Sequence, residues 1–293
     1  MSTLALTPTD ERDVCDCHVH VIGPMQRYRL VDKRSYTPMP ATAEDLIEMM
    51  QRCSVGRAVI VQPSVLGQDN TCTIDAMATI AQAGRQARAV AVLEHAVAPS
   101  QLDQWHRQGV RGLRVNLQSH ASGDLSLARQ ALQLAASQCE RNGWHVQLYV
   151  DRQTLYQLSE VIQALAVPVV LDHFAGLSAD EPPDAAANYV FELLATGEAW
   201  IKLSGNYRIT TDPLDPALGD LARQLAAINP DHLVWASDWP HTPSHSGQAT
   251  VNPPVTPYRD IDTCALSEQV QHWLAPATAK QVLCDNPARL YGF

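Results

Sequence analysis

The stretch Asp16-Cys17-His18-Val19-His20 carries both the first sign of the fold and the first candidate site. It lies within a short apolar run, residues 14–22, of the kind typical of a buried strand. Side chains two residues apart on a strand point to the same side, so His18 and His20 are expected to face one cavity. Two imidazoles in a cavity can bind a metal ion, or bind a carbonyl group and activate a water.

Outward from this stretch, short β-branched runs alternate with longer amphipathic segments. The expected strands cover residues 14–22, 57–62, 87–92, 110–116, 145–150, 167–172, 199–203 and 232–236. The expected helices start after Thr42 and cover 70–84, 100–108, 125–142, 152–165, 184–196, 216–228 and 267–283, the last one stopped by Asn286-Pro287. Eight strand–helix units predict a (β/α)8 TIM barrel, formed by a single domain over residues 1–293. An open doubly wound sheet is the alternative, but the chain contains no GxGxxG and no P-loop.

The composition limits the classes of partner and the compartment. The formal net charge is −10 and no long basic run occurs, so we expect neither nucleic acid nor a membrane as a partner. No apolar run approaches the length of a membrane span, and residues 1–12 lack the pattern of a signal peptide. The irregularly spaced cysteines contain no CxxC and are expected to be reduced thiols, which favours a cytoplasmic location; they are Cys15, Cys17, Cys53, Cys72, Cys139, Cys264 and Cys284.

Polar residues gather where the expected strands end, which is the end that carries the active site in TIM barrels. Any one of them could simply cap the helix that follows, but their coincidence on several strands predicts a functional site. The residues with this placement that we single out are His18, His20, Gln62, Ser64, Arg114, Tyr149, His173, Arg208 and Asp238.

Motifs spread along nearly the whole chain resemble those of the amidohydrolase superfamily, and most of all its branch of 2-pyrone-4,6-dicarboxylate lactonases. These motifs are DCHVHVIGP at 16–24, RSYTP at 34–38, VIVQPSVLGQDN at 59–70, GVRGLRVN at 109–116, GWHVQLYV at 143–150, LDHFAG at 171–176, ASDWPH at 236–241 and DNPARLYGF at 285–293. The resemblance implies a TIM-barrel enzyme that hydrolyses a lactone bearing carboxylates.

The resemblance also suggests roles for the candidate residues. Asp238 is expected to take a proton from water, while His18, His20 and His173 polarise the lactone carbonyl and stabilise the oxyanion. The expected carboxylate-binding residues are Arg114, Arg208, Tyr36, Ser64 and Tyr149, with Gln62 as a further contact to the substrate. The expected partner is a small anionic lactone.

The sequence departs from the metal-binding pattern found in many members of the superfamily. The fifth strand supplies Gln147 or Tyr149 in place of a histidine ligand, and the fourth strand supplies Arg114, a poor neighbour for a cation. We therefore expect no cofactor, as the resemblance to the pyrone lactonases implies. A single divalent metal such as zinc, held by His18, His20, His173 and Asp238, is the alternative.

A second departure concerns the substrate. The lactonases of this branch have a further arginine shortly after the fourth strand, whereas residues 117–120 here contain only His120 as a basic residue. This favours a monocarboxylate or a sugar lactone over a dicarboxylate. The alternative function is therefore a sugar-acid lactonase or lactone isomerase of the same family, with or without a zinc ion. A non-catalytic binding barrel would have no need of Asp238 beside three histidines.

Overall fold

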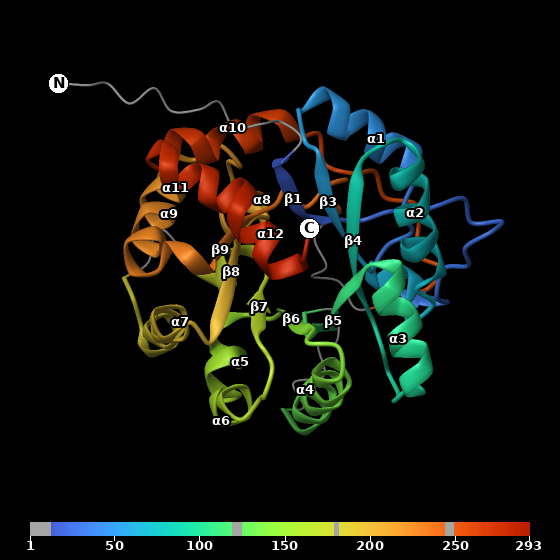
Figure 1. Cartoon of the computed structure of the whole chain (residues 1–293), viewed down its shortest axis with the longest axis horizontal. Coiled ribbons are helices and arrows are strands. Elements are labelled where there is room, and N and C mark those ends of the chain that lie inside the picture. The colour runs from blue at the N-terminus through green and yellow to red at the C-terminus, as the bar shows by residue number, and fades with distance from the viewer. Residues whose placement is uncertain (1–12, 119–124, 179–181, 244–248) are drawn as a thin grey trace.

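A computed structural model describes residues 13–118, 125–178, 182–243 and 249–293, and these form a barrel of parallel strands inside a ring of helices (Figure 1). The eight strands follow each other around the barrel in chain order: β1 (Cys15–Val19), β3 (Arg57–Val61), β4 (Gln86–Ala91), β5 (Val110–Asn116), β6 (His145–Tyr149), β7 (Val169–Leu171), β8 (Ala199–Leu203) and β9 (Leu233–Trp235). The segment after β9 then joins β1, since the His20 amide donates to the Trp239 carbonyl (2.8 Å) and the Asp238 amide to the His18 carbonyl (3.0 Å). The (β/α)8 prediction is confirmed.

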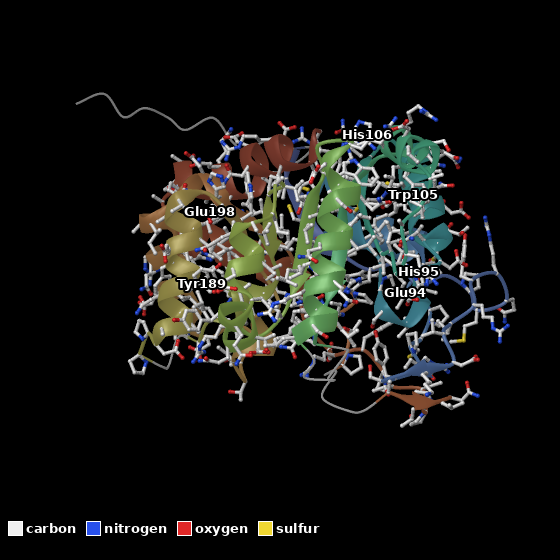
Figure 2. The ribbon with its side chains drawn as sticks, turned by 90° about the horizontal axis from the view of Figure 1, so that it is seen from below. Glu94, His95, Trp105, His106, Tyr189 and Glu198 are labelled. Atoms are coloured by element: carbon white, nitrogen blue, oxygen red, sulfur yellow. A yellow bond between two sulfur atoms is a disulfide. The ribbon has the colours of Figure 1, made fainter. Side chains whose placement is uncertain are left out.

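The helices cover the outside of this barrel (Figure 1). Helix α1 begins as predicted after Thr42, whose hydroxyl accepts from the Asp45 amide in a capping box. Figure 2 shows side chains of this outer layer on two sides of the barrel, Trp105 on α3 and Tyr189 on α7. The helices are α1 (Ala43–Arg52), α2 (Thr71–Gln82), α3 (Pro99–Gln108), α4 (Leu125–Glu140), α5 (Arg152–Gln157), α6 (Ser159–Gln163), α7 (Ala185–Thr196), α8 (Asn206–Ile209), α9 (Pro216–Ile228), α10 (Thr263–Trp273), α11 (Pro276–Lys280) and α12 (Asn286–Tyr291).

Two helix predictions need correction. The helix expected over 152–165 is broken at Leu158 into α5 and α6. The helix expected over 267–283 is interrupted after Trp273, where α10 ends and α11 follows from Pro276. The expected stop at Asn286-Pro287 is wrong as well, because α12 begins there, after a π-helical turn over Gln281–Asp285. Proline is tolerated in the first turn of a helix, where its missing N–H would have no partner within the helix.

Shorter elements, none of them predicted, lie between the main ones. They are a β2–β10 ribbon (Lys33–Arg34 with Thr250–Val251) and 3-10 turns over Ser64–Leu66, His173–Gly176 and Pro230–His232. The first two turns come shortly after β3 and β7, so they shape the carboxyl end of the barrel. The third turn precedes β9.

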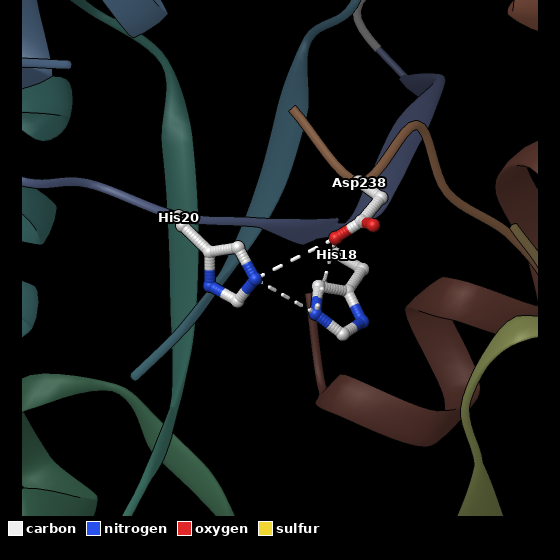
Figure 3. Close-up of side chains that lie close together, drawn as sticks. All are labelled: His18, His20 and Asp238. Atoms are coloured by element: carbon white, nitrogen blue, oxygen red, sulfur yellow. Dashed lines mark hydrogen bonds and ion pairs between the residues drawn. The ribbon is translucent and has the colours of Figure 1, made fainter. Parts of the chain in front are cut away.

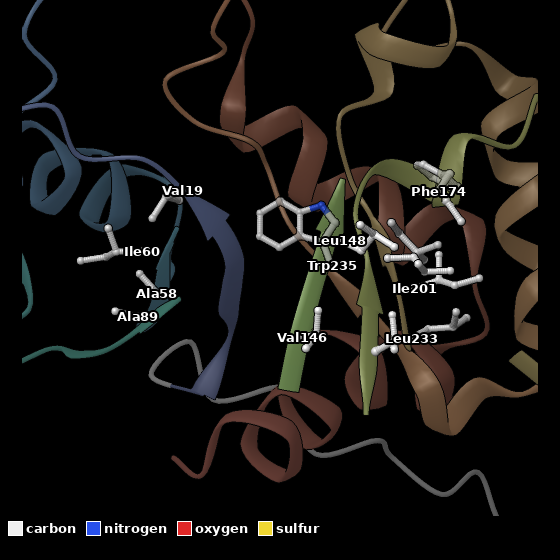
Figure 4. Close-up of a cluster of buried hydrophobic side chains, with 14 of the residues drawn as sticks. Val19, Ala58, Ile60, Ala89, Val146, Leu148, Phe174, Ile201, Leu233 and Trp235 are labelled. Carbon is white, nitrogen blue, oxygen red and sulfur yellow. The ribbon is translucent and has the colours of Figure 1, made fainter. Parts of the chain in front are cut away.

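Apolar side chains pack on both sides of the strands, as expected for a parallel sheet covered by helices. One cluster fills the space between strands and helices and includes Val19, Ile60, Val146, Ile201 and Leu233 (Figure 4). A second cluster fills the barrel interior with Cys15, Cys17, Val59, Val61, Val90, Val170, Trp200, Val234, Ala236 and Tyr291. The polar site described below therefore lies above a packed core.

The expectation that all cysteines are free thiols is wrong. Cys53, which caps the end of α1, forms a disulfide with Cys264 in the first turn of α10, across 211 residues of sequence. Spacing along the chain cannot reveal such a pair, because only closure of the barrel brings the first and the last large helices together. The disulfide also removes the support that reduced cysteines gave to a cytoplasmic location.

Among the described residues, no helix combines the length and the apolar character that a membrane span requires.

Candidate active site

The two histidines of the opening motif do share one cavity. A register shift in the pairing of β1 with β3, between Asp16 and Val19, places Cys17 in the interior cluster and Val19 in the outer one. His18 lies within this irregularity and His20 follows it, and their Nε2 atoms lie 3.3 Å apart. Both side chains are buried.

Asp238 follows β9, which lies beside β1 in the barrel, and its carboxyl group points toward both histidines (Figure 3). Its Oδ1 atom lies 3.5 Å from Nε2 of His20 and 3.8 Å from Nε2 of His18. This oxygen is buried and has no hydrogen-bond partner among the described residues. A buried carboxylate oxygen without a partner is costly, so it indicates a group that is ready for a ligand or a proton.

The second oxygen of Asp238 is firmly held. Oδ2 accepts from Nε of Arg208 (2.7 Å) and from the hydroxyl of Tyr207 (2.8 Å). Burial alone would raise the pKa of this carboxyl group, but the positive charge of Arg208 outweighs it and holds the pKa well below its usual range. Asp238 is therefore ionised at neutral pH, with one free oxygen.

Hydrogen bonds on the far side of each ring fix the state of the first two histidines. Nδ1 of His18 lies 3.2 Å from Oδ1 of Asp172, and Nδ1 of His20 lies 2.7 Å from the Val61 carbonyl. These partners are acceptors, so each Nδ1 carries a proton, and in a neutral ring Nε2 then presents a lone pair. Burial lowers the pKa of His18 well below its usual value, which keeps its ring neutral.

His173 differs from the other two histidines, because its Nδ1 lies 3.0 Å from the Ser204 hydroxyl, which can donate as well as accept. With Ser204 as the donor, Nε2 of His173 carries the proton, 3.8 Å from Oδ2 of Asp238. Burial lowers the pKa of His173 to about 4. Gly205 is needed here, since a Cβ atom on it would lie 2.4 Å from Nδ1 of His173.

Two of the site residues have a backbone conformation that is uncommon outside glycine. The φ angles of His173 and Asp238 are +54° and +64°. Such conformations persist where the surrounding structure enforces them, and they gather at functional sites.

Two buried arginines and two tyrosines border this cluster. The guanidinium of Arg114 lies 5.8 Å from the centre of the Tyr149 ring, and that of Arg208 lies 6.0 Å from it. Within the part of the chain that the structure describes, the polar contacts of Arg114 are long, 3.4 Å to the Gln62 carbonyl and 3.7 Å to Asp172, and its Nε has no partner. Tyr36 is buried, and its hydroxyl interacts with Thr242 near Arg208.

The remaining predicted residues are placed differently. The side-chain amide of Gln62 is used within the fold, donating to the carbonyls of Gly67 and Asp69 and accepting from Thr73. Ser64 lies at the carboxyl end of β3 and is a candidate by position alone. His120 lies outside the described residues.

Two residues of the site, Tyr207 and Lys202, escaped the sequence-based selection, and a third, Asp172, stands at a strand end but was given no role. Tyr207 donates to Asp238, Asp172 accepts from His18, and Lys202 lies 3.4 Å from Asp172. Nothing in the local pattern distinguishes Tyr207. Lys202 could have been found, because a lysine in the apolar strand AWIKL poses the same question as Arg114 in its strand.

The triad of His18, His20 and Asp238 admits a zinc ion by distance alone. Tetrahedral ligands with bonds of about 2.1 Å lie about 3.4 Å apart, close to the 3.3–3.8 Å observed among these three atoms. The charge of the surroundings opposes it, because the same ion-pair network already joins two carboxylates, Asp172 and Asp238, to three buried cations: Arg114, Lys202 and Arg208. A divalent ion would add two positive charges where the cations already exceed the anions.

Comparisons with known proteins agree with this geometry. The family model for amidohydrolases matches residues 15–293. A 4-sulfomuconolactone hydrolase from Rhizobium radiobacter is 31% identical over 283 residues, covering 94% of this chain and 89% of the relative. A 2-pyrone-4,6-dicarboxylate hydrolase from Comamonas testosteroni is 27% identical over 288 residues, with the same two coverages of 94% and 89%. Among solved structures, a probable 2-pyrone-4,6-dicarboxylic acid hydrolase from Acinetobacter baumannii with citric acid bound superposes with a TM-score of 0.75 at 26% identity, covering 96% of this chain and all of the other.

Proposed function

Because the chain belongs to the amidohydrolase family, we propose that it is a hydrolase that opens a lactone carrying a negatively charged substituent, in the manner of a 2-pyrone-4,6-dicarboxylate lactonase. The relatives support the reaction, since their names specify hydrolysis of lactones that bear sulfo or carboxylate groups. The proposal treats residues 1–293 as one catalytic barrel domain.

The single observation that carries the proposal is the convergence of three proton acceptors: Oδ1 of Asp238 and the Nε2 atoms of His18 and His20. A water molecule is a small ligand with two protons to donate and lone pairs left over. Water can donate its two protons to two of these acceptors at a time, Oδ1 of Asp238 and one of the Nε2 atoms, and this pairing suits the water that attacks a carbonyl carbon. Asp238 is the base among them because it is the charged member.

The proposed reaction keeps one proton in circulation. Water attacks the lactone carbonyl while its proton passes to Oδ1 of Asp238, and the carbonyl oxygen becomes a tetrahedral oxyanion. The C–O bond of the ring then breaks, and Asp238 returns the proton to the departing ring oxygen. The product is the open hydroxy acid or its keto tautomer, and Asp238 is again ionised.

The residues with protons to donate stabilise the oxyanion. His173 is the histidine suited to this task, because it can carry its proton on Nε2 when Ser204 donates to its Nδ1. The Nε2 lone pair of His18 or of His20 accepts the second proton of the attacking water and orients it instead. This divides a task that the sequence assigned to all three histidines alike. Donors placed before the charge develops are commonly the largest single contribution to catalysis.

Arg114 supports an anionic substrate. Its guanidinium is buried, its Nε is unpaired among the described residues, and its other contacts are long. A buried guanidinium in this state fits a planar anion such as a carboxylate. Arg208 is partly committed to Asp238, so we assign the first anionic group of the substrate to Arg114, with Tyr149 beside it.

We propose further that turnover needs no metal. The ion-pair network that includes Asp238 holds three cations and two carboxylates, and its positive charge would be neutralised by an anionic substrate and increased by a metal ion. If zinc is bound, His18, His20 and Asp238 are the ligands, and the ion would supply Lewis-acid polarisation of the carbonyl.

The test is the loss of pyrone ultraviolet absorbance when the purified protein meets 2-pyrone-4,6-dicarboxylate, with and without prior chelation. Equal turnover in both samples supports the metal-free lactonase. Turnover that is lost on chelation and restored by zinc would replace the metal-free part of the proposal. No turnover in either sample would favour the sugar-acid lactonase or isomerase, assayed by acid release from sugar lactones with added zinc.

A further inference from the structure

Beneath the site, one fully buried lysine joins four strands of the barrel. We propose that Lys202 of β8 is a positioning residue that fixes the orientation and tautomer of His18. This inference rests on the proposed function, because it gives His18 a task in the reaction. Lys202 does not itself reach the place of the reacting atoms, so it acts through its neighbours.

The ammonium group of Lys202 has three acceptors around it. Nζ donates to the Cys17 carbonyl of β1 (2.9 Å) and to Oε1 of Gln147 on β6 (2.7 Å), and it lies 3.4 Å from Oδ1 of Asp172, which follows β7. The side chain is 0% exposed. Each of the three protons of the ammonium group thus has a separate acceptor.

These contacts reach His18 from two directions. The carbonyl of Cys17 belongs to the peptide that leads directly into His18, so the contact holds the backbone of β1 at its irregular point. Oδ1 of Asp172 also accepts from Nδ1 of His18 at 3.2 Å, so the same ammonium group holds the partner of the ring.

Gln147 completes the arrangement. Its Oε1 accepts from Lys202, which directs its Nε2 toward Oδ2 of Asp172 at 3.1 Å. Both oxygens of Asp172 are thereby held, and Oδ1 is aimed at His18. Partners of this kind, one step removed from the reacting group, typically change activity by about 10- to 100-fold when they are removed.

Stability alone is a weak reason for this lysine. Removing an ammonium ion from water costs several kcal/mol, and an apolar side chain of similar size is often at least as stable in such a place. The neighbouring interior positions on other strands are indeed apolar, such as Val59, Val170 and Val234. What the buried ammonium group of Lys202 specifically provides is a fixed geometry for Asp172 and His18.

The test compares Lys202→Met with Val59→Ala, a control that perturbs the same interior cluster from a strand outside the network. We expect Lys202→Met to lower kcat for the lactone by about 10- to 100-fold with less than a threefold change in KM. We expect Val59→Ala to lower stability with kcat nearly unchanged. Gln147→Leu, which keeps the lysine but removes the bridge, should lower kcat about tenfold, and it replaces Lys202→Met if that variant does not fold.

A second readout needs no substrate. In chelated protein labelled with 15N-histidine, His18 should show a protonated Nδ1 and a lone pair on Nε2, with its signals identified by their loss in His18→Gln. The two network variants should show a mixture of tautomers, while Val59→Ala should not. An unchanged tautomer together with a kcat no lower than that of Val59→Ala would overturn the inference. Because the tautomer is read without turnover, a failure of the lactonase proposal leaves this test intact.

Discussion

The two ends of the same barrel are built in opposite ways. At the carboxyl end, His18, His20 and Asp238 form a polar cluster with an unpaired carboxylate oxygen. At the amino end, Tyr291 is buried in the apolar interior cluster, and the ring of the C-terminal Phe293 lies against the guanidinium groups of Arg57 and Arg88, 5.5 Å and 4.7 Å from its centre.

This difference separates chemistry from stability along each strand. β5 carries Arg111 near the amino end of the barrel and Arg114 near the carboxyl end. β9 likewise runs from the turn containing Asp231, at the amino end, toward Asp238. Arg111 donates to backbone carbonyls, whereas Nε of Arg114 has no partner among the described residues. Substitutions at the two ends of one strand should therefore affect different measurements, as in TIM barrels generally.

The largest expected effect is that of Asp238→Asn. The amide cannot take the proton of the attacking water, so kcat should fall by about 10³- to 10⁴-fold while the substrate still binds. Stopped or steady-state hydrolysis and substrate binding by calorimetry measure the two effects. Asp231→Asn, at the other end of β9, should retain turnover. Substantial hydrolysis by Asp238→Asn would remove this residue from the role of base.

Loss of the disulfide should change stability with little effect on chemistry. Cys53→Ser opens a link across 211 residues, and we expect the free energy of unfolding to fall by about 2–4 kcal/mol. Denaturant unfolding measures this, with Cys72→Ser as a control because Cys72 is a buried free thiol. Equal midpoints for wild type and Cys53→Ser would mean that the link contributes nothing, and a large fall in kcat at low denaturant would break the separation drawn above.

Arg114→Gln should act on binding. Without the guanidinium, the anionic group of the substrate loses its charged partner, so KM should rise by about 100-fold with a smaller change in kcat. Arg111→Gln on the same strand is the matched control and should leave KM unchanged. A normal KM for Arg114→Gln would move the anion-binding role to Arg208 or Tyr36.

Much of the barrel could be predicted from sequence, because its signal repeats. Runs such as RAVIVQ at 57–62 and AWIKL at 199–203 are read as strands directly, and β5 and β8 begin and end where expected. The tail was misread, because Pro287 both ends helices and begins them, and the sequence does not distinguish the two cases. The Cys53–Cys264 pair depends on closure of the barrel and leaves no local trace.

Candidate site residues could be selected from the sequence by residue type and by position at a strand end. His18, His20, His173 and Asp238 stand at strand ends and were selected for that reason, and the structure brings their side chains together. The sequence cannot show what each side chain already holds. Gln62 is used within its loop, and Arg208 is paired with the base instead of standing free for the substrate. Such partners come from distant strands and are decided by three-dimensional geometry.

The last expected effect concerns the buried carboxyl group of Asp16, which lies where β1 meets the segment after β9. Oδ1 of Asp16 accepts from the amides of His18 (3.2 Å) and Ser237 (3.0 Å), while its Oδ2 has no partner among the described residues. Burial raises the pKa of Asp16 from 3.8 to about 6. The folded state thus holds this proton more tightly than the unfolded chain, so this group's contribution to stability falls as the pH rises from about 4 through 6.

Asp16→Asn keeps the Oδ1 acceptor and removes the charge. We expect it to match the wild type near pH 4 and to exceed its free energy of unfolding by about 3 kcal/mol at pH 8. Chemical denaturation of both proteins across this range isolates the effect, because the acid-sensitive buried histidines are common to both. A wild type that is the more stable one at pH 8 would show that the charged form of Asp16 is favoured by the fold. The charged character of the carboxyl end of the barrel would then extend to Asp16, at the level of the packed core.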